Sequence, residues 1–205
     1  MENLSKIFVE SASDLRNWLE NNHKSTESHW LVKWKKDSGK LYLSYDEMVD
    51  ELICFGWVDS LPRRLDAQRT MILISPRNPK SNWSGVNKRR VAKLLKEQRM
   101  KPSGLGLVEQ AKLNGAWNFL DDVENLVIPV DLSTELEKAG KAKYYFERFP
   151  DSSKRGILEW IKNAKRETTR QKRILETATK AARNIKANHP KGRDAGPKAE
   201  PNNQT

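Results

Sequence analysis

The sequence has few of the residues that build covalent or metal cross-links. Cys54 is its single cysteine among 205 residues, so no internal disulfide can form, and one thiol is too few for a zinc or iron-sulfur site. The three histidines, His23, His29 and His189, are scattered and show no His-x-x-x-His spacing. We therefore expect no metal site and no cofactor, and a reducing compartment fits this composition.

Long apolar runs are also missing. The N-terminus lacks the basic start and the following apolar run, about 7 to 15 residues long, that a secretory signal requires. No window approaches the roughly 18 apolar residues of a membrane-spanning helix. These patterns predict a soluble cytoplasmic protein.

Motifs for known chemistry are absent in the same way. The sequence contains neither of the glycine-rich phosphate-binding patterns, G-x-x-x-x-G-K-[ST] and G-x-G-x-x-G, and no elbow that would support a Ser-His-Asp arrangement. Cys54 lies in an apolar stripe without a nearby base, which favours a small core residue over a nucleophile. We therefore expect a binding protein and not an enzyme.

Positive charge is abundant and unevenly placed. The formal net charge is +11, and two segments, 76–101 and 162–186, each hold nine Lys or Arg residues, so the rest of the chain is mildly acidic. Concentrated positive charge favours polyanions or phosphorylated ligands as partners. A basic face that serves only solubility is the alternative interpretation.

The stretch 76–90, PRNPKSNWSGVNKRR, combines two prolines, one tryptophan and five cationic residues. The prolines fix the backbone, and Ser81, Asn82 or Ser84 can cap a helix that follows. A helix N-terminus flanked by cations is a candidate anion site. Alternatively, the turn is a structural clasp, which holds the sheet and the helices together and is anchored by the Trp83 side chain.

The apolar periodicity predicts an α+β fold in which a small, mainly antiparallel sheet with helices is followed by an all-helical part. Ser44 begins a capping box, Gly56 ends that helix, and Ser103 is expected to cap another. The N-terminal part, 1–128, is expected to hold a helix, a strand, a helix, two adjacent antiparallel strands and two further helices, over residues 11–22, 28–36, 44–56, 57–61, 69–75, 84–99 and 103–114.

A composition shift places the domain boundary near residue 128. Beyond it, a helical region is expected over 129–186, with helix caps at Asp131 or Ser133 and at Asp151 or Ser152, and a last helix over 167–185. The polar tail, residues 187–205, is expected to be disordered because it has almost no apolar content.

Three separated blocks resemble a known family. The runs SYDEMVDELICFGWVDS, SPRNPKSNWSGVNKRRVAKLLKEQRMKPSG and GILEWIKNAKRETTRQKRI closely resemble the YdeI/OmpD-associated family, also called bacteriocin-protection proteins, over about residues 10–185. The resemblance implies a bacterial cytoplasmic protein linked to protection from bacteriocins and envelope-directed peptides, and it carries no catalytic residues across. The family's recurrent positions correspond here to Phe55, Gly56, Trp57, Asp59, Ser60, Pro76, Arg77, Pro79, Lys80, Ser81, Trp83, Asn87, Trp160, Ala164, Lys165, Thr169 and Arg170.

Together these patterns predict a pocket for a phosphate or carboxylate ligand between the 76–90 turn and the junction at 56–64. Cations would supply charge, hydroxyls and amides would donate hydrogen bonds, and a tryptophan would offer a stacking face. The second basic segment either completes the same site or extends it into a surface. The candidate residues are Trp57, Asp59, Ser60, Arg63, Arg64, Arg77, Lys80, Ser81, Asn82, Trp83, Ser84, Asn87, Lys165 and Arg170.

Two other functions remain open on this pattern. The two basic segments can form one surface for nucleic acid, whose affinity would fall steeply with salt. Alternatively, Asp59 beside Arg63 or Arg64 can act as a base on a phosphorylated small molecule. The weakly amphipathic last helix is expected to pack against a neighbour and not on a membrane, and the sequence specifies no oligomeric state.

Overall fold

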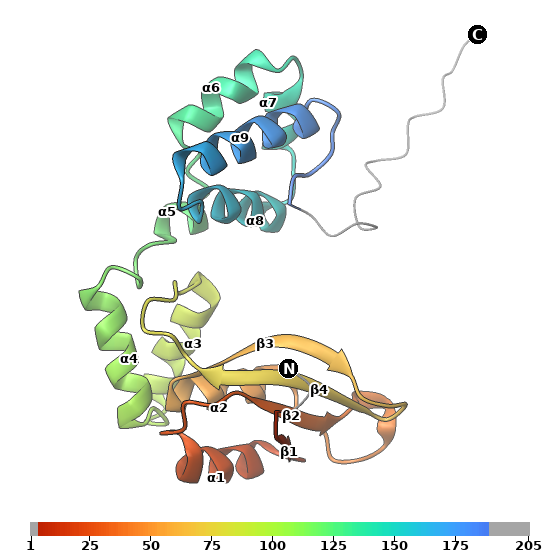
Figure 1. The fold of residues 1–205 in the computed structure, drawn as a ribbon, viewed down its shortest axis with the longest axis vertical. Coiled ribbons are helices and arrows are strands. Elements are labelled where there is room, and N and C mark those ends of the chain that lie inside the picture. Colours follow the sequence, from red (N-terminus) through yellow and green to blue (C-terminus); the bar gives the residue numbers. More distant parts are fainter. Residues whose placement is uncertain (1–3, 189–205) are drawn as a thin grey trace. The chain divides into compact units, whose positions relative to one another are not determined.

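The computed structural model describes residues 4–188, and the chain divides into two compact units between Phe119 and Leu120 (Figure 1). The composition of the sequence predicts this boundary near residue 128. Of the expected disordered tail, only Ala187 and Asn188 lie within the described residues, and Ala187 is buried. The predicted α+β class is confirmed, with a four-stranded sheet in the first unit.

The sheet of the first unit has the strand order β1-β2-β4-β3. The two middle strands are antiparallel, β4 and β3 form an antiparallel hairpin, and β1 pairs with β2 in parallel. The parallel pair requires a crossover, which helix α1 supplies. The strands and this helix are β1 (Lys6–Phe8), α1 (Ala12–Asn22), β2 (His29–Trp34), β3 (Trp57–Arg64) and β4 (Arg69–Pro76).

Local capping explains where the helices of this unit begin and end. Ser44 forms the predicted capping box, and Gly56 ends the helix in the left-handed conformation with φ of 78°. Ser84 caps the helix that follows the basic turn. The predicted cap at Ser103 is wrong, because Pro102 already occupies the first turn and Lys101 is the N-cap residue. These elements are the short 3-10 helix η1 (Lys36–Ser38), α2 (Tyr45–Phe55), α3 (Gly85–Lys96) and α4 (Pro102–Leu113).

One face of the sheet forms the main core with the helices. Alternate residues of the central strands, Leu31 and Ile74, are fully buried together with Leu19 of α1 and Leu52 of α2. In Figure 1, α1 and α2 lie close to the sheet. Because the same core includes Val91 and Leu94 of α3, the basic helix is fixed by its apolar side.

The second unit is all-helical over its described residues, as predicted. Its helices are α5 (Asp121–Glu124), α6 (Val130–Lys138), α7 (Ala142–Glu147), α8 (Asp151–Lys162) and α9 (Glu167–Ala181). The predicted side-chain caps at Asp131 or Ser133 and at Asp151 or Ser152 are wrong. The N-cap positions belong to Pro129 and Pro150, whose fixed φ sets the start of each helix.

The core of the second unit includes Leu132, Phe146, Ile161 and Ile174, all of which are buried. Among residues 4–188, no helix combines the length and the apolar character needed to cross a membrane.

Candidate functional site

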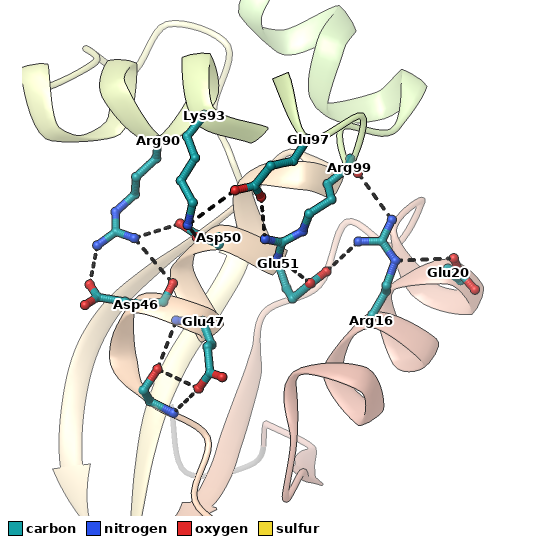
Figure 2. Close-up of polar contacts among 11 residues, drawn as sticks. Arg16, Glu20, Asp46, Glu47, Asp50, Glu51, Arg90, Lys93, Glu97 and Arg99 are labelled. Carbon is teal, nitrogen blue, oxygen red and sulfur yellow. Dashed lines mark hydrogen bonds and ion pairs between the residues drawn. The ribbon is translucent and has the colours of Figure 1, made fainter. Parts of the chain in front are cut away.

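Helix α2 carries two buried carboxylates that bind basic residues of the 76–101 segment (Figure 2). Asp50 is only 4% exposed, and it accepts from Arg90 at 2.7 Å and from Lys93 at 3.1 Å. Arg90 also contacts the exposed Asp46. A buried carboxylate needs partners of this kind because desolvation would otherwise penalise its charge.

Glu51 forms the second half of this network. It is also 4% exposed, and it bonds Arg16 of α1 at 2.8 Å and Arg99 at 2.8 Å. Lys101 pairs with Glu20 at 3.0 Å. Arg90, Lys93, Arg99 and Lys101 therefore hold helices together, and the cationic surface available to an outside partner is smaller than the sequence suggests.

Arg77 differs from these paired cations. It is 7% exposed, its guanidinium carbon lies 3.9 Å from the centroid of the Trp83 ring, and its Nη2 donates to the carbonyl oxygen of Asn82 at 2.6 Å. No carboxylate within the described residues pairs with it, and its buried Nε has no hydrogen-bond partner. Burial lowers the pKa of Arg77 to about 10.

Trp83 fixes this turn to the segment that follows α4. Its ring is 2% exposed and packs on Trp117 with a centroid distance of 5.2 Å. Its backbone N–H donates to Ala116 at 3.3 Å, and the Asn114 side chain donates to the carbonyl of Pro79 at 2.9 Å. These contacts support the structural-clasp interpretation, in which the Trp83 side chain anchors the turn.

A pocket of about 450 Å³ lies beside the clasp. Lys80 is an exposed residue of this lining, and no carboxylate within the described residues pairs with its ammonium group. Asn82 also lines the pocket, and its backbone carbonyl oxygen accepts a hydrogen bond from the Arg77 guanidinium, so Arg77 lies behind Asn82. An ammonium group and two side-chain amides suit an anion. The pocket is lined by Lys80, Asn82, Asn114, Gly115, Ala116 and Phe119.

The residues predicted at the 56–64 junction do not join this pocket. Trp57 is a core residue, 1% exposed, whose ring nitrogen donates to the carbonyl of His23 at 3.3 Å. The strand register pairs Trp57 with Pro76 but Arg63 with Met71 and Arg64 with Thr70. At roughly 3.3 Å per residue, the two arginines lie on the order of 20 Å along the strand from the turn.

The polar side chains predicted at the 56–64 junction contact residues outside the pocket. The guanidinium of Arg63 lies 5.2 Å from the Trp30 ring centroid, and the Nε of Arg64 donates to the carbonyl of Asp66 at 3.3 Å. Asp59 accepts from the hydroxyl of Tyr45 at 2.9 Å, and Ser60 donates to the carbonyl of Leu73 at 3.3 Å. Burial, followed by the bond to Asp59, raises the pKa of Tyr45 to about 12.

Three more predicted residues shape the turn without lining the pocket. Ser84 accepts from the backbone N–H of Asn87 at 3.3 Å, so both residues serve the start of α3. The backbone N–H of Ser81 donates to the carbonyl of Asn78 at 2.9 Å.

Lys165 and Arg170 belong to the second unit. Arg170 forms a two-point contact with Asp131, at 2.7 and 2.9 Å, and these bonds lower the pKa of the Asp131 carboxyl. Lys162 pairs with Asp122 at 2.5 Å. Lys165 is exposed. Several cations of this segment thus also bind carboxylates within their own unit.

No group of histidine, cysteine, aspartate or glutamate residues suited to a metal ion occurs among residues 4–188. Burial raises the pKa of the Cys54 thiol to about 11, so it stays protonated at neutral pH. Sequence reasoning missed Asn114 and Phe119 in the pocket lining. The Asn114-Gly115 pair was recognisable as a helix end, but its approach to the turn follows only from tertiary packing.

The fold therefore defines an α+β unit with a clasped basic turn, joined to a separate helical unit. Residues 125–184 match the family model described as Bacteriocin-protection, YdeI or OmpD-Associated, which confirms the predicted family for this segment. Residues 7–107 match a different model, described as a domain of unknown function (DUF8412), although the resemblance seen in the sequence extended over this part as well. Comparisons with curated proteins and with solved structures gave no match.

Proposed function

We propose that the protein is a non-enzymatic binding protein that takes a small anionic or phosphate-bearing ligand in the pocket lined by Lys80, Asn82 and Asn114. The observation that carries this proposal is the unequal pairing of cations. Arg90, Lys93, Arg99 and Lys101 all meet carboxylates, whereas Lys80 and the buried Arg77 behind Asn82 meet none within the described residues.

The energetic reason is that a buried cation without a counter-charge is costly, and a nearby anion offsets part of that cost. The ligand's charge would lie against the Lys80 ammonium and the amides of Asn82 and Asn114, while Phe119 offers an apolar surface to its body. The lining contains no carboxylate, imidazole or thiol to act as an acid or base at neutral pH, which supports binding without chemistry.

The match at residues 125–184 supports a biological setting for this binding. The family's description names bacteriocin protection, and we propose that ligand binding by the first unit serves that role in the cytoplasm. Nucleic acid is the less favoured partner, because many cations of both basic segments are already bound to carboxylates of their own unit.

Calorimetric titration with inorganic phosphate and with small phosphate monoesters tests the proposal. We expect saturable binding by the native protein. Lys80→Ala should lower the affinity at least about tenfold, because the loss of one charge-assisted contact costs about 1.4 kcal/mol, which corresponds to a tenfold change in Kd. Lys96→Ala is the matched control, because Lys96 is an exposed lysine of α3 outside the pocket. Equal affinity of both variants, or no saturable binding of any phosphate compound, would contradict the proposal.

A further inference from the structure

The first unit contains a second pocket, of about 350 Å³, which lies apart from the clasp. Three helix ends meet there. The end of α1 contributes Glu20, His23 and Lys24, the end of α2 contributes Phe55, and the start of α4 contributes the run Lys101, Pro102 and Ser103.

The inner wall of this pocket is apolar and aromatic. Phe55 is 3% exposed, and its ring meets the His23 ring at a centroid distance of 6.0 Å. The Lys101 ammonium lies 5.9 Å from the Phe55 centroid. Together with the ring of Pro102, these groups form a surface that suits a flat apolar molecule.

The backbone polar groups at the three helix ends differ in whether they have hydrogen-bond partners. At the two C-terminal ends, the carbonyl oxygen of Cys54 accepts from the Lys101 N–H at 3.0 Å, and that of His23 accepts from the ring N–H of Trp57 at 3.3 Å. The N-terminal end of α4 has no side-chain cap. Pro102 has no N–H, so the first-turn N–H groups without an acceptor inside the helix are those of Ser103 and Gly104, and the hydroxyl oxygen of Ser103 is buried without a hydrogen-bond partner.

Charge at the pocket is positive on balance. The Glu20 carboxylate is bound by Lys101 at 3.0 Å and approached by Arg16 at 3.9 Å. No carboxylate within residues 4–188 pairs with the Lys24 ammonium, which is exposed at the pocket. A cation and a helix N-terminus beside an aromatic wall select an anion that carries an apolar ring.

We propose that this pocket binds a small aromatic carboxylate. The ring packs on Phe55 and Pro102, and the carboxylate accepts from the Lys24 ammonium, from the Ser103 hydroxyl and from the first turn of α4. This ligand class is independent of the phosphate-bearing ligand assigned to the Lys80 pocket, and the two sites share no residues.

Titration of the full chain with 1-naphthoate tests this inference. Saturable binding is expected, with 1-naphthalenemethanol, which has the same ring and no charge, binding at least about fivefold more weakly. Lys24→Ala and Ser103→Ala are each expected to weaken naphthoate binding by at least about threefold, whereas Lys36→Ala, an exposed lysine of η1, should leave it unchanged.

Inorganic phosphate separates this site from the Lys80 pocket. Excess phosphate is expected not to displace naphthoate. Failure of one proposed site can therefore be distinguished from failure of the other. The inference is overturned by the absence of saturable naphthoate binding, by equal binding of the acid and the alcohol, or by Lys24→Ala and Ser103→Ala proteins that fold normally by circular dichroism and bind naphthoate like the native protein.

Discussion

Glu51 and Asp50 are adjacent carboxylates of α2 that are almost entirely buried, yet they bind cations from different parts of the first unit. Glu51 joins α1 to the segment after α3 through Arg16 and Arg99, while Asp50 binds Arg90 and Lys93 of α3 (Figure 2). Removing Asp50 leaves Arg90 only the exposed Asp46, and removing Glu51 leaves Arg99 only the partly exposed Glu97 and Arg16 only Glu20 at 3.9 Å. The partly buried guanidiniums then lose their buried counter-charge, which is costly.

We predict that Glu51→Ala lowers the free energy of unfolding by about 3 kcal/mol, the low end for a buried pair, because Arg16 and Arg99 keep part of their surface in water. Asp46→Ala is the control, since the Asp46 side chain is 77% exposed and its pair with Arg90 should contribute no more than about 1 kcal/mol. Urea unfolding of both variants gives the comparison. Equal losses would show that burial does not set the value of these pairs.

Helix ends illustrate which elements the sequence could predict. The Ser44 capping box and the left-handed Gly56 are local features, in which residues three or four positions apart satisfy one another, and both were predicted correctly. The predicted caps at Ser103, at Asp131 or Ser133 and at Asp151 or Ser152 are wrong, because a neighbouring proline sets the start of each helix instead. Strand β1 was missed because three residues carry too little periodicity, and its pairing partner is distant in the chain.

Two glycines of α4 give a matched prediction about helix packing. A methyl group on Gly104 would lie 2.3 Å from the carbonyl oxygen of Cys54, so α4 must shift away from α2, whereas a methyl group on Gly106 meets nothing within 4 Å. We expect Gly104→Ala to destabilise by about 1–3 kcal/mol and Gly106→Ala to stabilise by up to about 1 kcal/mol. Thermal unfolding measures both, and stabilisation by Gly104→Ala would show that the close approach of α4 to α2 is wrong.

The pair between Asp131 of α6 and Arg170 of α9 predicts a pH dependence for the second unit. Bonds from Arg170 hold the pKa of Asp131 below its ordinary value of 3.8, so the folded state binds fewer protons than the unfolded state near that pH. The contribution of the pair is therefore complete above about pH 5 and is lost as the pH falls through the folded-state pKa.

Asp131→Asn should accordingly cost about 1 kcal/mol at pH 7, because both partners are partly exposed, and the difference from the native protein should shrink toward zero below about pH 3. Urea unfolding at a series of pH values measures this difference. A difference that stays constant from pH 7 to pH 2 would mean that the ion pair is not its source.

The molecule as a whole shows why the lining of the candidate pocket could be predicted only in part. The turn and its cations were visible as a local pattern, and so was the alternative of a clasp around Trp83. The pocket wall at Asn114 comes from 35 residues further along than Pro79, to which it donates, and no local signal announces that contact. Arg63 and Arg64 were grouped with the turn by nearness in sequence, but strand register carries them to the far end of the hairpin.

Charge counting alone gives an incomplete account of the surface for a related reason. The net charge of each basic segment describes the chain but not its surface, because folding brings the acidic face of α2 against the basic face of α3. The same holds in the second unit, where Asp122 and Asp131 bind Lys162 and Arg170. The cations outside these ion pairs, such as Lys80, Arg89, Lys96 and Lys165, are therefore fewer than the sequence count suggests.

Backbone amide NMR shifts measured during titration with inorganic phosphate test the central claim, a phosphate-binding site beside the clasped turn, most directly. The structure predicts saturable shifts confined to residues 80–82 and 114–119, with little change along α3 or α9 and with the same residues silent in Lys80→Ala. Shifts spread evenly over the basic faces of α3 and α9, unchanged by Lys80→Ala, would contradict it and indicate a diffuse polyanion surface instead.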